Sequence, residues 1–252
     1  MSFEIAADAY GRFMGRYSVL LSPQLADLAG IASGQDVLDV GCGPGALTAE
    51  LVERLGPERV TAVDPSEPFV AAARGRHPGV AVEQAPAERL PFADERFDAA
   101  LAQLVVHFMA DPVAGLREMS RVTRADGVVA ASVWDLAGGR APLSVFWEAA
   151  LELDPGAQGE SAFSGTCEGH LAELFVAAGL REIDEATQTV HVEYATFDEW
   201  WEPYTLGVGP AGAYVARLDP EHTARLREAC RARLPEAPFR VTASAWAVRG
   251  VV

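Results

Sequence analysis

The sequence has few basic residues for its length, and they form no continuous run. Its 252 residues include 20 Lys and Arg against 36 Asp and Glu, which gives a formal net charge of −16 at pH 7. Such a balance repels phosphate backbones at long range, which argues against nucleic acid as substrate or partner. An acidic surface that only keeps the protein soluble explains the same charge, so the balance alone assigns no function.

A long hydrophobic run is also missing, although 50% of the residues are hydrophobic. No segment approaches the roughly 20 apolar residues that a membrane-spanning helix needs. The first eight residues lack the basic and then apolar layout of a secretory signal. We therefore expect a cytoplasmic protein without membrane insertion.

Cysteine is scarce, and Cys42, Cys167 and Cys230 show no C-x-x-C spacing. This pattern indicates neither a disulfide framework nor a metal site, and an odd count fits a reducing compartment. Cys42 lies among glycines, where it is either a nucleophile or a small side chain that a tight turn tolerates.

The stretch around that cysteine, residues 37–48, is the strongest local signal in the chain. A short apolar run predicts a buried strand, the alternate glycines Gly41, Gly43 and Gly45 break it, and helical spacing resumes at Ala46. Glycines there allow a sharp turn and the close approach of a ligand, and the helix N-terminus offers unpaired N–H groups. We therefore expect a cofactor site at this turn.

A carboxylate follows the next predicted strand. Asp64 comes directly after an apolar run and precedes Pro65, Ser66 as a plausible helix N-cap, and a helical pattern from Phe69. Ligands of doubly wound sheets bind at the carboxyl ends of strands, where an acid about 20 residues beyond the glycines accepts hydrogen bonds from ribose hydroxyls. We therefore predict that Asp64 binds a ribose.

Strand and helix patterns alternate as far as residue 135 and predict a parallel sheet that helices cover on both faces. A turn is expected at Asp126 and Gly127. The N-terminal residues 6–30 predict two short helices broken near Ser22 and Pro23, whose aromatic residues either cover a cofactor as a lid or only pack the helices. The expected strands to residue 135 are 37–40, 59–63, 80–84, 97–104 and 128–134, and the helices are 46–55, 69–74 and 112–122.

The second half of the chain predicts helices at 143–153 and 168–178, separated by a mobile loop, and strands at 180–194 and 238–248. Between those strands, residues 197–233 predict helices with a glycine-rich break at 207–212. Connections of that length usually carry function. We expect a single domain over 1–252, with an N-terminal helical lid at 1–34, a cofactor-binding core at 35–135, and a C-terminal half at 136–252 that carries a substrate-cap insertion at about 195–236.

The order of these motifs resembles the class I S-adenosylmethionine-dependent methyltransferases, in the branch that includes quinone-biosynthesis and other small-molecule enzymes. The likeness covers about residues 10–135, and the C-terminal half resembles the family only in architecture. The motifs that carry it are Tyr10-x-x-Phe13-Met14-Gly15-Arg16-Tyr17-Ser18, Asp39-x-Gly41-x-Gly43-x-Gly45, Asp64, and Ala87-Glu88-x-Leu90-Pro91-Phe92 before Phe97-Asp98.

The resemblance implies an α/β fold with a doubly wound, mostly parallel sheet of seven strands, a Rossmann-like methyltransferase fold with helical cap elements. In it, 180–194 is the sixth strand and 238–248 an antiparallel seventh. S-adenosylmethionine is the implied cofactor and S-adenosylhomocysteine the product. The implied cofactor-binding residues are Tyr10, Arg16, Asp39, Gly41, Gly43, Gly45, Asp64, Pro65, Ser66, Phe69, Pro86, Ala87, Glu88, Gln103 and Leu104.

Within that set the resemblance implies individual roles. Asp39 orients the turn or, through water, the cofactor's ammonium, while Phe69 and Leu104 flank the adenine. Members of the branch often carry an acid before the Ala-Glu pair that accepts from the adenine amino group, where this chain has Pro86. Either Glu88 or a backbone carbonyl takes that task, or binding loses the about 1 kcal/mol that such a contact contributes.

Methyl transfer from a sulfonium is an in-line displacement, so the protein mainly has to hold two reactants close and exclude water. A base is needed only for an acceptor that arrives protonated. His107, after the fourth strand, is the candidate, with a packed histidine as the alternative. For the tryptophans, core packing is the alternative to a place at the acceptor. The residues predicted to line the acceptor site are His107, Trp134, Asp135, Trp200 and Trp201.

Two other functions stay open. Gly41-x-Gly43-x-x-Ala46 also satisfies the fingerprint of an NAD(P)-dependent oxidoreductase, although Asp39 would repel a pyrophosphate. A non-catalytic S-adenosylmethionine-binding protein would keep the fold and lose the reaction. We expect a small-molecule methyl acceptor. Its identity, the methylated atom and the oligomeric state, monomer or homodimer, are left open.

Overall fold

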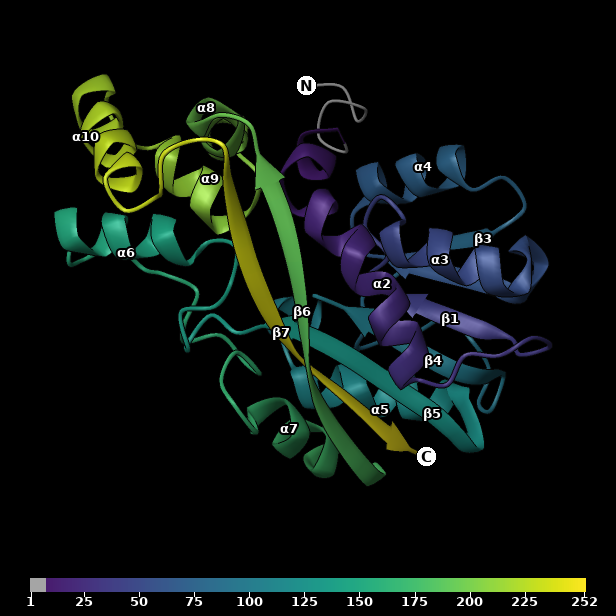
Figure 1. Ribbon diagram of the computed structural model, residues 1–252. Coiled ribbons are helices and arrows are strands. Elements are labelled where there is room, and N and C mark those ends of the chain that lie inside the picture. Colours follow the sequence, from purple (N-terminus) through teal and green to yellow (C-terminus); the bar gives the residue numbers. More distant parts are fainter. Residues whose placement is uncertain (1–7) are drawn as a thin grey trace.

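One seven-stranded sheet organises the chain in the order β3-β2-β1-β4-β5-β7-β6, with helices on both of its faces (Figure 1). This computed structural model describes residues 8–252. The stretch 1–7, which holds most of the segment without a signal layout and the start of the predicted lid, lies outside the described residues.

The strands agree with the predicted ones in number and direction. β1 to β5 are parallel neighbours, and β7 runs antiparallel between β5 and β6. The predicted fold class is therefore confirmed, including its antiparallel seventh strand. The bounds are β1 Val37–Val40, β2 Val60–Asp64, β3 Ala81–Gln84, β4 Phe97–Gln103, β5 Thr123–Trp134, β6 Arg181–Tyr194 and β7 Phe239–Val251.

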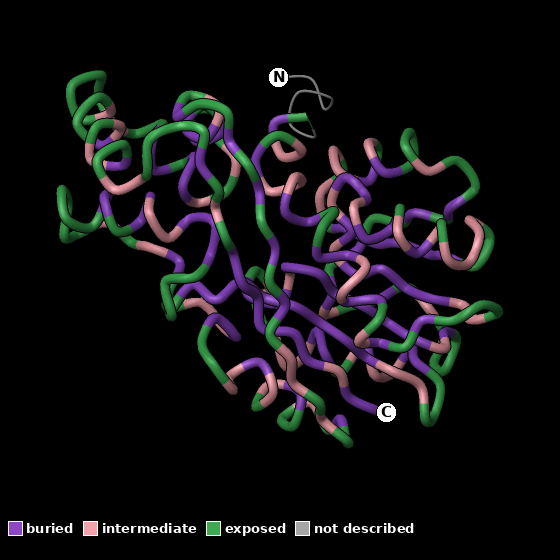
Figure 2. Tube along the Cα trace, in the orientation of Figure 1, coloured by how far each residue is buried: buried purple, intermediate pink, exposed green. Residues whose placement is uncertain are grey.

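Alternate residues of the central strands serve the two helical layers. Val37 of β1 joins the core under α2, α3 and α4, whereas Leu38 and Val40 join the core under α5 and α7. This alternation follows from the two-residue period of a strand, and Figure 2 shows the strands as the buried middle of the molecule. The helices are α2 Arg16–Leu28, α3 Ala46–Leu55, α4 Glu67–Arg76, α5 Pro112–Val122 and α7 His170–Ala178, with short helical turns η2 Pro57–Arg59 and η3 Val106–Phe108.

A third core lies beyond the sheet, under the cap helices that stand apart from it at the left of Figure 1. Arg12 and Arg16 of the N-terminal segment pair with Glu202 (3.0 Å) and Glu199 (2.9 Å) of this region. The ring of Phe13 meets that of Tyr204 edge to face. These contacts join the N-terminal segment to the cap. The elements involved are η1 Gly11–Gly15, α6 Ser144–Leu153, α8 Phe197–Trp201, η4 Glu202–Leu206, α9 Gly209–Val215 and α10 Pro220–Arg231.

The predicted helix break near Ser22 and Pro23 is wrong, because α2 continues through Pro23. A proline inside a helix costs about 3 kcal/mol. Leu21 and Leu25, on either side of it, are fully buried, and each buried leucine contributes about 1.5–3 kcal/mol. The change of helix type falls earlier instead, where the π-helical turn η1 meets α2.

Two predicted turns also differ from the structure. The pairing of β4 with β5 shifts between Phe97 and Ala99, so residues 124–127 bulge within β5 rather than precede it, and Asp126 takes a φ of 61° there. The glycine-rich break is shorter than predicted, because α9 begins at Gly209 and runs through Gly212. A Cβ on Gly212 would lie 2.7 Å from the backbone of residue 207, so this glycine allows close packing inside a helix.

Candidate active site

The glycine turn joins the carboxyl end of β1 to the first turn of α3, as the sequence predicts. Gly41, Gly43 and Gly45 have φ angles of 70°, 53° and 98°, which residues with a Cβ rarely adopt. A Cβ on Gly41 would lie 2.5 Å from Val105, whereas one on Gly43 would meet nothing within 4 Å. The turn is therefore tight toward β4 and open at Gly43.

Asp64 lies at the end of β2 and faces this turn. Its Oδ2 accepts from the Gly43 amide (2.9 Å), and its Oδ1 accepts from the Ser66 amide (2.8 Å). Ser66 occupies the N-cap position of α4 without a side-chain cap, and Pro65 is exposed. Burial raises the pKa of Asp64, while the two amides act against that shift. A carboxylate offers about four acceptor sites, so each oxygen keeps one for a ligand hydroxyl.

Two buried groups beneath the turn do not face it as ligands. Asp39, only 1% exposed, accepts from the Thr48 hydroxyl (2.6 Å) and thereby joins β1 to α3. Burial raises the pKa of Asp39 to about 7. Its role toward a ligand ammonium stays a prediction. Burial also raises the pKa of the Cys42 thiol, which favours the small-residue explanation over a nucleophile.

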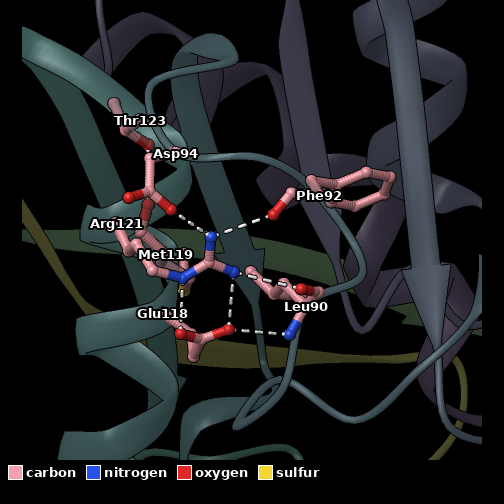
Figure 3. Close-up of polar contacts among 7 residues, drawn as sticks. All are labelled: Leu90, Phe92, Asp94, Glu118, Met119, Arg121 and Thr123. Carbon is pink, nitrogen blue, oxygen red and sulfur yellow. Dashed lines mark hydrogen bonds and ion pairs between the residues drawn. The ribbon is translucent and has the colours of Figure 1, made fainter.

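The segment 87–92, after β3, is held against α5 by one arginine (Figure 3). Arg121 donates to the carbonyl oxygens of Leu90 (3.1 Å) and Phe92 (2.9 Å), and it pairs with Glu118 and Asp94. Glu118 in turn accepts from the Leu90 amide (2.9 Å). This network fixes the backbone that carries Ala87, which is 7% exposed.

Glu88 was one of three explanations for the acid missing at Pro86. Its Oε1 accepts from the amides of Ala110 (2.8 Å) and Asp111 (3.3 Å), so it ties the segment 87–92 to the start of α5. Pro86 is exposed. The carboxylate of Glu88 is thus partly occupied by the protein's own backbone, which favours a backbone carbonyl for the task.

The N-terminal segment approaches the site from above the turn. The Tyr10 ring meets the Phe69 ring edge to face, with centroids 5.5 Å apart. Arg16 stacks over Tyr194 and borders, with Gly45 and Tyr10, a cavity of about 400 Å³ on the outer side of the turn. Tyr10 also borders the cavity described next, so this residue lies between the two.

An apolar cavity of about 200 Å³ lies at the carboxyl ends of β4 and β5, under the N-terminal segment and α9. Leu104, at its wall, has a φ of 60°, a strained value for leucine of the kind that functional sites often hold. Gln103 lies outside the wall and donates to the Ser18 carbonyl (3.0 Å), which joins β4 to α2. The aromatic residues of the wall are Tyr10, Phe13, Phe69, Phe108 and Trp134.

His107 lies at this cavity, as the sequence predicts, in the turn η3 after β4. The ring is 9% exposed, and among residues 8–252 its Nδ1 has no hydrogen-bond partner. Burial lowers the pKa of His107 to about 3. The imidazole is therefore neutral at pH 7, and it is a weak base because its pKa lies far below the working pH.

Of the other residues predicted for the acceptor site, the structure brings only Trp134 to the cavity. Asp135 is 1% exposed, forms an ion pair with Arg140 and accepts from the Gly138 amide, so it supports the chain after β5. Trp200 and Trp201 pack in the cap core. The prediction failed there because a strand-end acid and aromatic residues at helical spacing look the same whether they are structural or face a ligand.

Sequence reasoning missed Glu160, the one carboxylate among the described residues of the cavity wall. It is 3% exposed and lies in the loop between α6 and α7. Nothing in the sequence marks it, because the loop carries other acids and no motif. Only the chain's return to β5 brings it beside His107, whose ring stacks with that of Phe163 at 6.3 Å.

The strand order with its antiparallel β7, and the open glycine turn that faces Asp64, define the fold of the class I S-adenosylmethionine-dependent methyltransferases. Residues 38–131 match the family model described as a methyltransferase domain, and this segment of the chain belongs to that family. The resemblance drawn from the sequence is confirmed.

Named relatives match over a similar region. A malonyl-[acyl-carrier protein] O-methyltransferase of Erwinia billingiae is 34% identical over 128 residues, which cover 51% of this chain and 50% of that protein. A demethylmenaquinone methyltransferase of Beutenbergia cavernae is 40% identical over 101 residues, 40% of this chain and 41% of that protein. The chain thus spans about half the length of the curated relatives it matches, or less.

Solved structures extend the likeness of fold to nearly the whole chain. An N-methyltransferase 2 of Haemonchus contortus, in complex with phosphomonomethylethanolamine and S-adenosylhomocysteine, has a TM-score of 0.59 and 16% identity, and covers 97% of this chain and 56% of that one. At this identity the likeness concerns the fold alone. Among residues 8–252, no helix has both the length and the apolar character that crossing a bilayer requires.

Proposed function

We propose that this protein transfers the methyl group of S-adenosylmethionine to a small-molecule acceptor. The observation that carries the proposal is the pairing of the open glycine turn with Asp64 at one edge of the sheet, next to an apolar cavity. Both features lie at the carboxyl ends of the central strands, where ligands of such sheets bind.

The residues present fit this cofactor. Gly43 leaves open space that a Cβ would fill, and the Asp64 carboxylate keeps acceptor sites for two ribose hydroxyls. Phe69 and Leu104 offer apolar surface beside them for a purine. Asp64, Gly41, Gly43, Phe69 and Leu104 would thus hold the cofactor, which supplies a methyl group activated by a positively charged sulfur.

The chain's own contribution is to position the acceptor and to exclude water. The aromatic wall of the cavity removes solvent from the reacting centre, and a cavity of about 200 Å³ restricts the orientations of an acceptor. His107 at neutral pH accepts a hydrogen bond rather than a proton. Catalysis therefore rests on proximity, with no strong imidazole base.

Strand order separates this proposal from a nicotinamide oxidoreductase. Dinucleotide-binding sheets have the order 3-2-1-4-5-6, whereas here the antiparallel β7 lies between β5 and β6. The buried Asp39 beneath the turn also disfavours a pyrophosphate above it. A non-catalytic binding protein is disfavoured by the open turn and the ordered Asp64. The small size of the cavity favours a small molecule over nucleic acid.

Replacement of Asp64 tests the cofactor site. Asp64→Ala removes hydrogen bonds to two hydroxyls, each worth about 1.5–3 kcal/mol with a charged acceptor, so S-adenosylhomocysteine should bind roughly 100-fold more weakly. Glu67→Gln, an exposed acid three residues on, is the matched control and should bind as the wild type does. Calorimetric titration measures both. Unchanged affinity in a folded Asp64→Ala protein would remove Asp64 from the site.

A further inference from the structure

Glu160 has an unmet hydrogen-bond capacity inside an apolar cavity. Its Oε2 accepts from the Trp147 indole N–H (2.8 Å), and among residues 8–252 its Oε1 has no hydrogen-bond donor. Within the same residues no Lys, Arg or His nitrogen forms an ion pair with this carboxylate, which is 3% exposed. A buried carboxylate is costly unless it is paired or hydrogen-bonded.

The surroundings hold this carboxylate in place rather than release it to solvent. Trp147 is itself 6% exposed, and a Cβ on Gly159, the residue before Glu160, would lie 3.6 Å from its ring. The Glu160 carbonyl accepts from the Phe163 amide (3.1 Å) and closes the turn. Side chain and backbone are thus both fixed, and the carboxylate belongs to the cavity wall.

The rest of the wall defines the body of a fitting ligand. Apart from Glu160, His107 and Tyr10, the side chains are aliphatic or aromatic. The volume of about 200 Å³ is below the roughly 300–1,000 Å³ of most ligand sites. A compact apolar molecule with one polar group fits such a space.

We infer that Glu160 is the specificity residue of the acceptor site, and that it binds the neutral hydroxyl of a compact, apolar or aromatic acceptor. This inference rests on the proposed function, because a cofactor with a positive sulfur at the same cavity already uses the single negative charge. An ammonium group on the acceptor would bring a second positive charge that no group of the wall neutralises. A hydroxyl donates a hydrogen bond without that penalty.

Three probes of the same shape test the inference by calorimetry without any turnover: naphthalene, 2-naphthol and 2-naphthylmethylammonium. The wild type should bind 2-naphthol at least about tenfold more tightly than naphthalene, the factor expected of one hydrogen bond to a charged group. In Glu160→Gln, which keeps the shape and an acceptor for Trp147, this ratio should fall below about threefold. Glu168→Gln, an exposed acid of the same loop, should keep the wild-type ratio.

Binding of 2-naphthol should also shift the Trp147 indole N–H resonance of the wild type, a measurement that needs no variant. Equal affinity for 2-naphthol and naphthalene in the wild type, an unchanged ratio in Glu160→Gln, or tightest binding of the ammonium would each overturn the role of Glu160. S-adenosylhomocysteine should bind the wild type and Glu160→Gln equally. If the wild type does not bind it, the proposed function fails; if it does and 2-naphthol is not preferred, only the inference fails.

Discussion

Gly41→Ala should destabilise the protein far more than Gly43→Ala, although both glycines belong to one turn and both have positive φ. At Gly41 a Cβ would lie 2.5 Å from both Cγ atoms of Val105 and 3.0 Å from its Cβ. At Gly43 a Cβ would meet nothing within 4 Å. The pair therefore separates the cost of backbone strain from the cost of a steric overlap.

The magnitudes follow from these two contributions. A left-handed alanine costs about 1–2 kcal/mol of unfolding free energy, which applies to both variants. Overpacking adds about 1–3 kcal/mol at Gly41 alone. We expect losses of about 2–5 kcal/mol for Gly41→Ala and about 1–2 kcal/mol for Gly43→Ala. Val105→Ala removes both Cγ atoms and should return most of the overpacking part in the double variant.

Urea unfolding measures the free energies, and S-adenosylhomocysteine titration measures binding. Gly43→Ala should remain folded yet lose at least about tenfold in affinity, because its methyl group projects into the space assigned to the cofactor. Equal stability losses for the two variants, or no rescue by Val105→Ala, would refute the reasoning about the turn. Full affinity in Gly43→Ala would refute the position of the cofactor.

Two further predictions concern the loop network and the buried histidine. Arg121→Met removes the hydrogen bonds to Leu90 and Phe92 (Figure 3), so unfolding free energy should fall by about 1–3 kcal/mol and amide exchange in 88–94 should accelerate; unchanged exchange would contradict this. The pKa of His107 is lowered to about 3 from 6.5, so the unfolded chain binds the extra proton between those values and stability falls as pH drops below 6.5. Between pH 7 and pH 5 the wild type should lose about 2 kcal/mol more than His107→Phe, by urea unfolding at both pH values, and a parallel loss would show an accessible imidazole.

The sheet was predictable because its signals are local. Each strand is a short apolar run that a turn residue ends, and Gly179, with a φ of 95°, closes α7 where expected. The errors arose where tertiary packing outweighs local preference. Pro23 lies inside a helix because buried leucines on both sides hold it there.

The two halves of the candidate site differ in the same way. The glycine turn and Asp64 lie within 25 residues of each other, so spacing alone brought them together. The acceptor cavity combines His107 with Glu160 and with α9, which are far apart in the chain. No local pattern separates Trp134, which reaches the cavity, from Trp200, which packs in the cap core.

Calorimetric titration of the wild type with S-adenosylmethionine, S-adenosylhomocysteine and NAD tests the central claim most directly. The account predicts saturable binding of both sulfur compounds at one site and none of NAD. Tight binding of NAD without a response to either sulfur compound would contradict it.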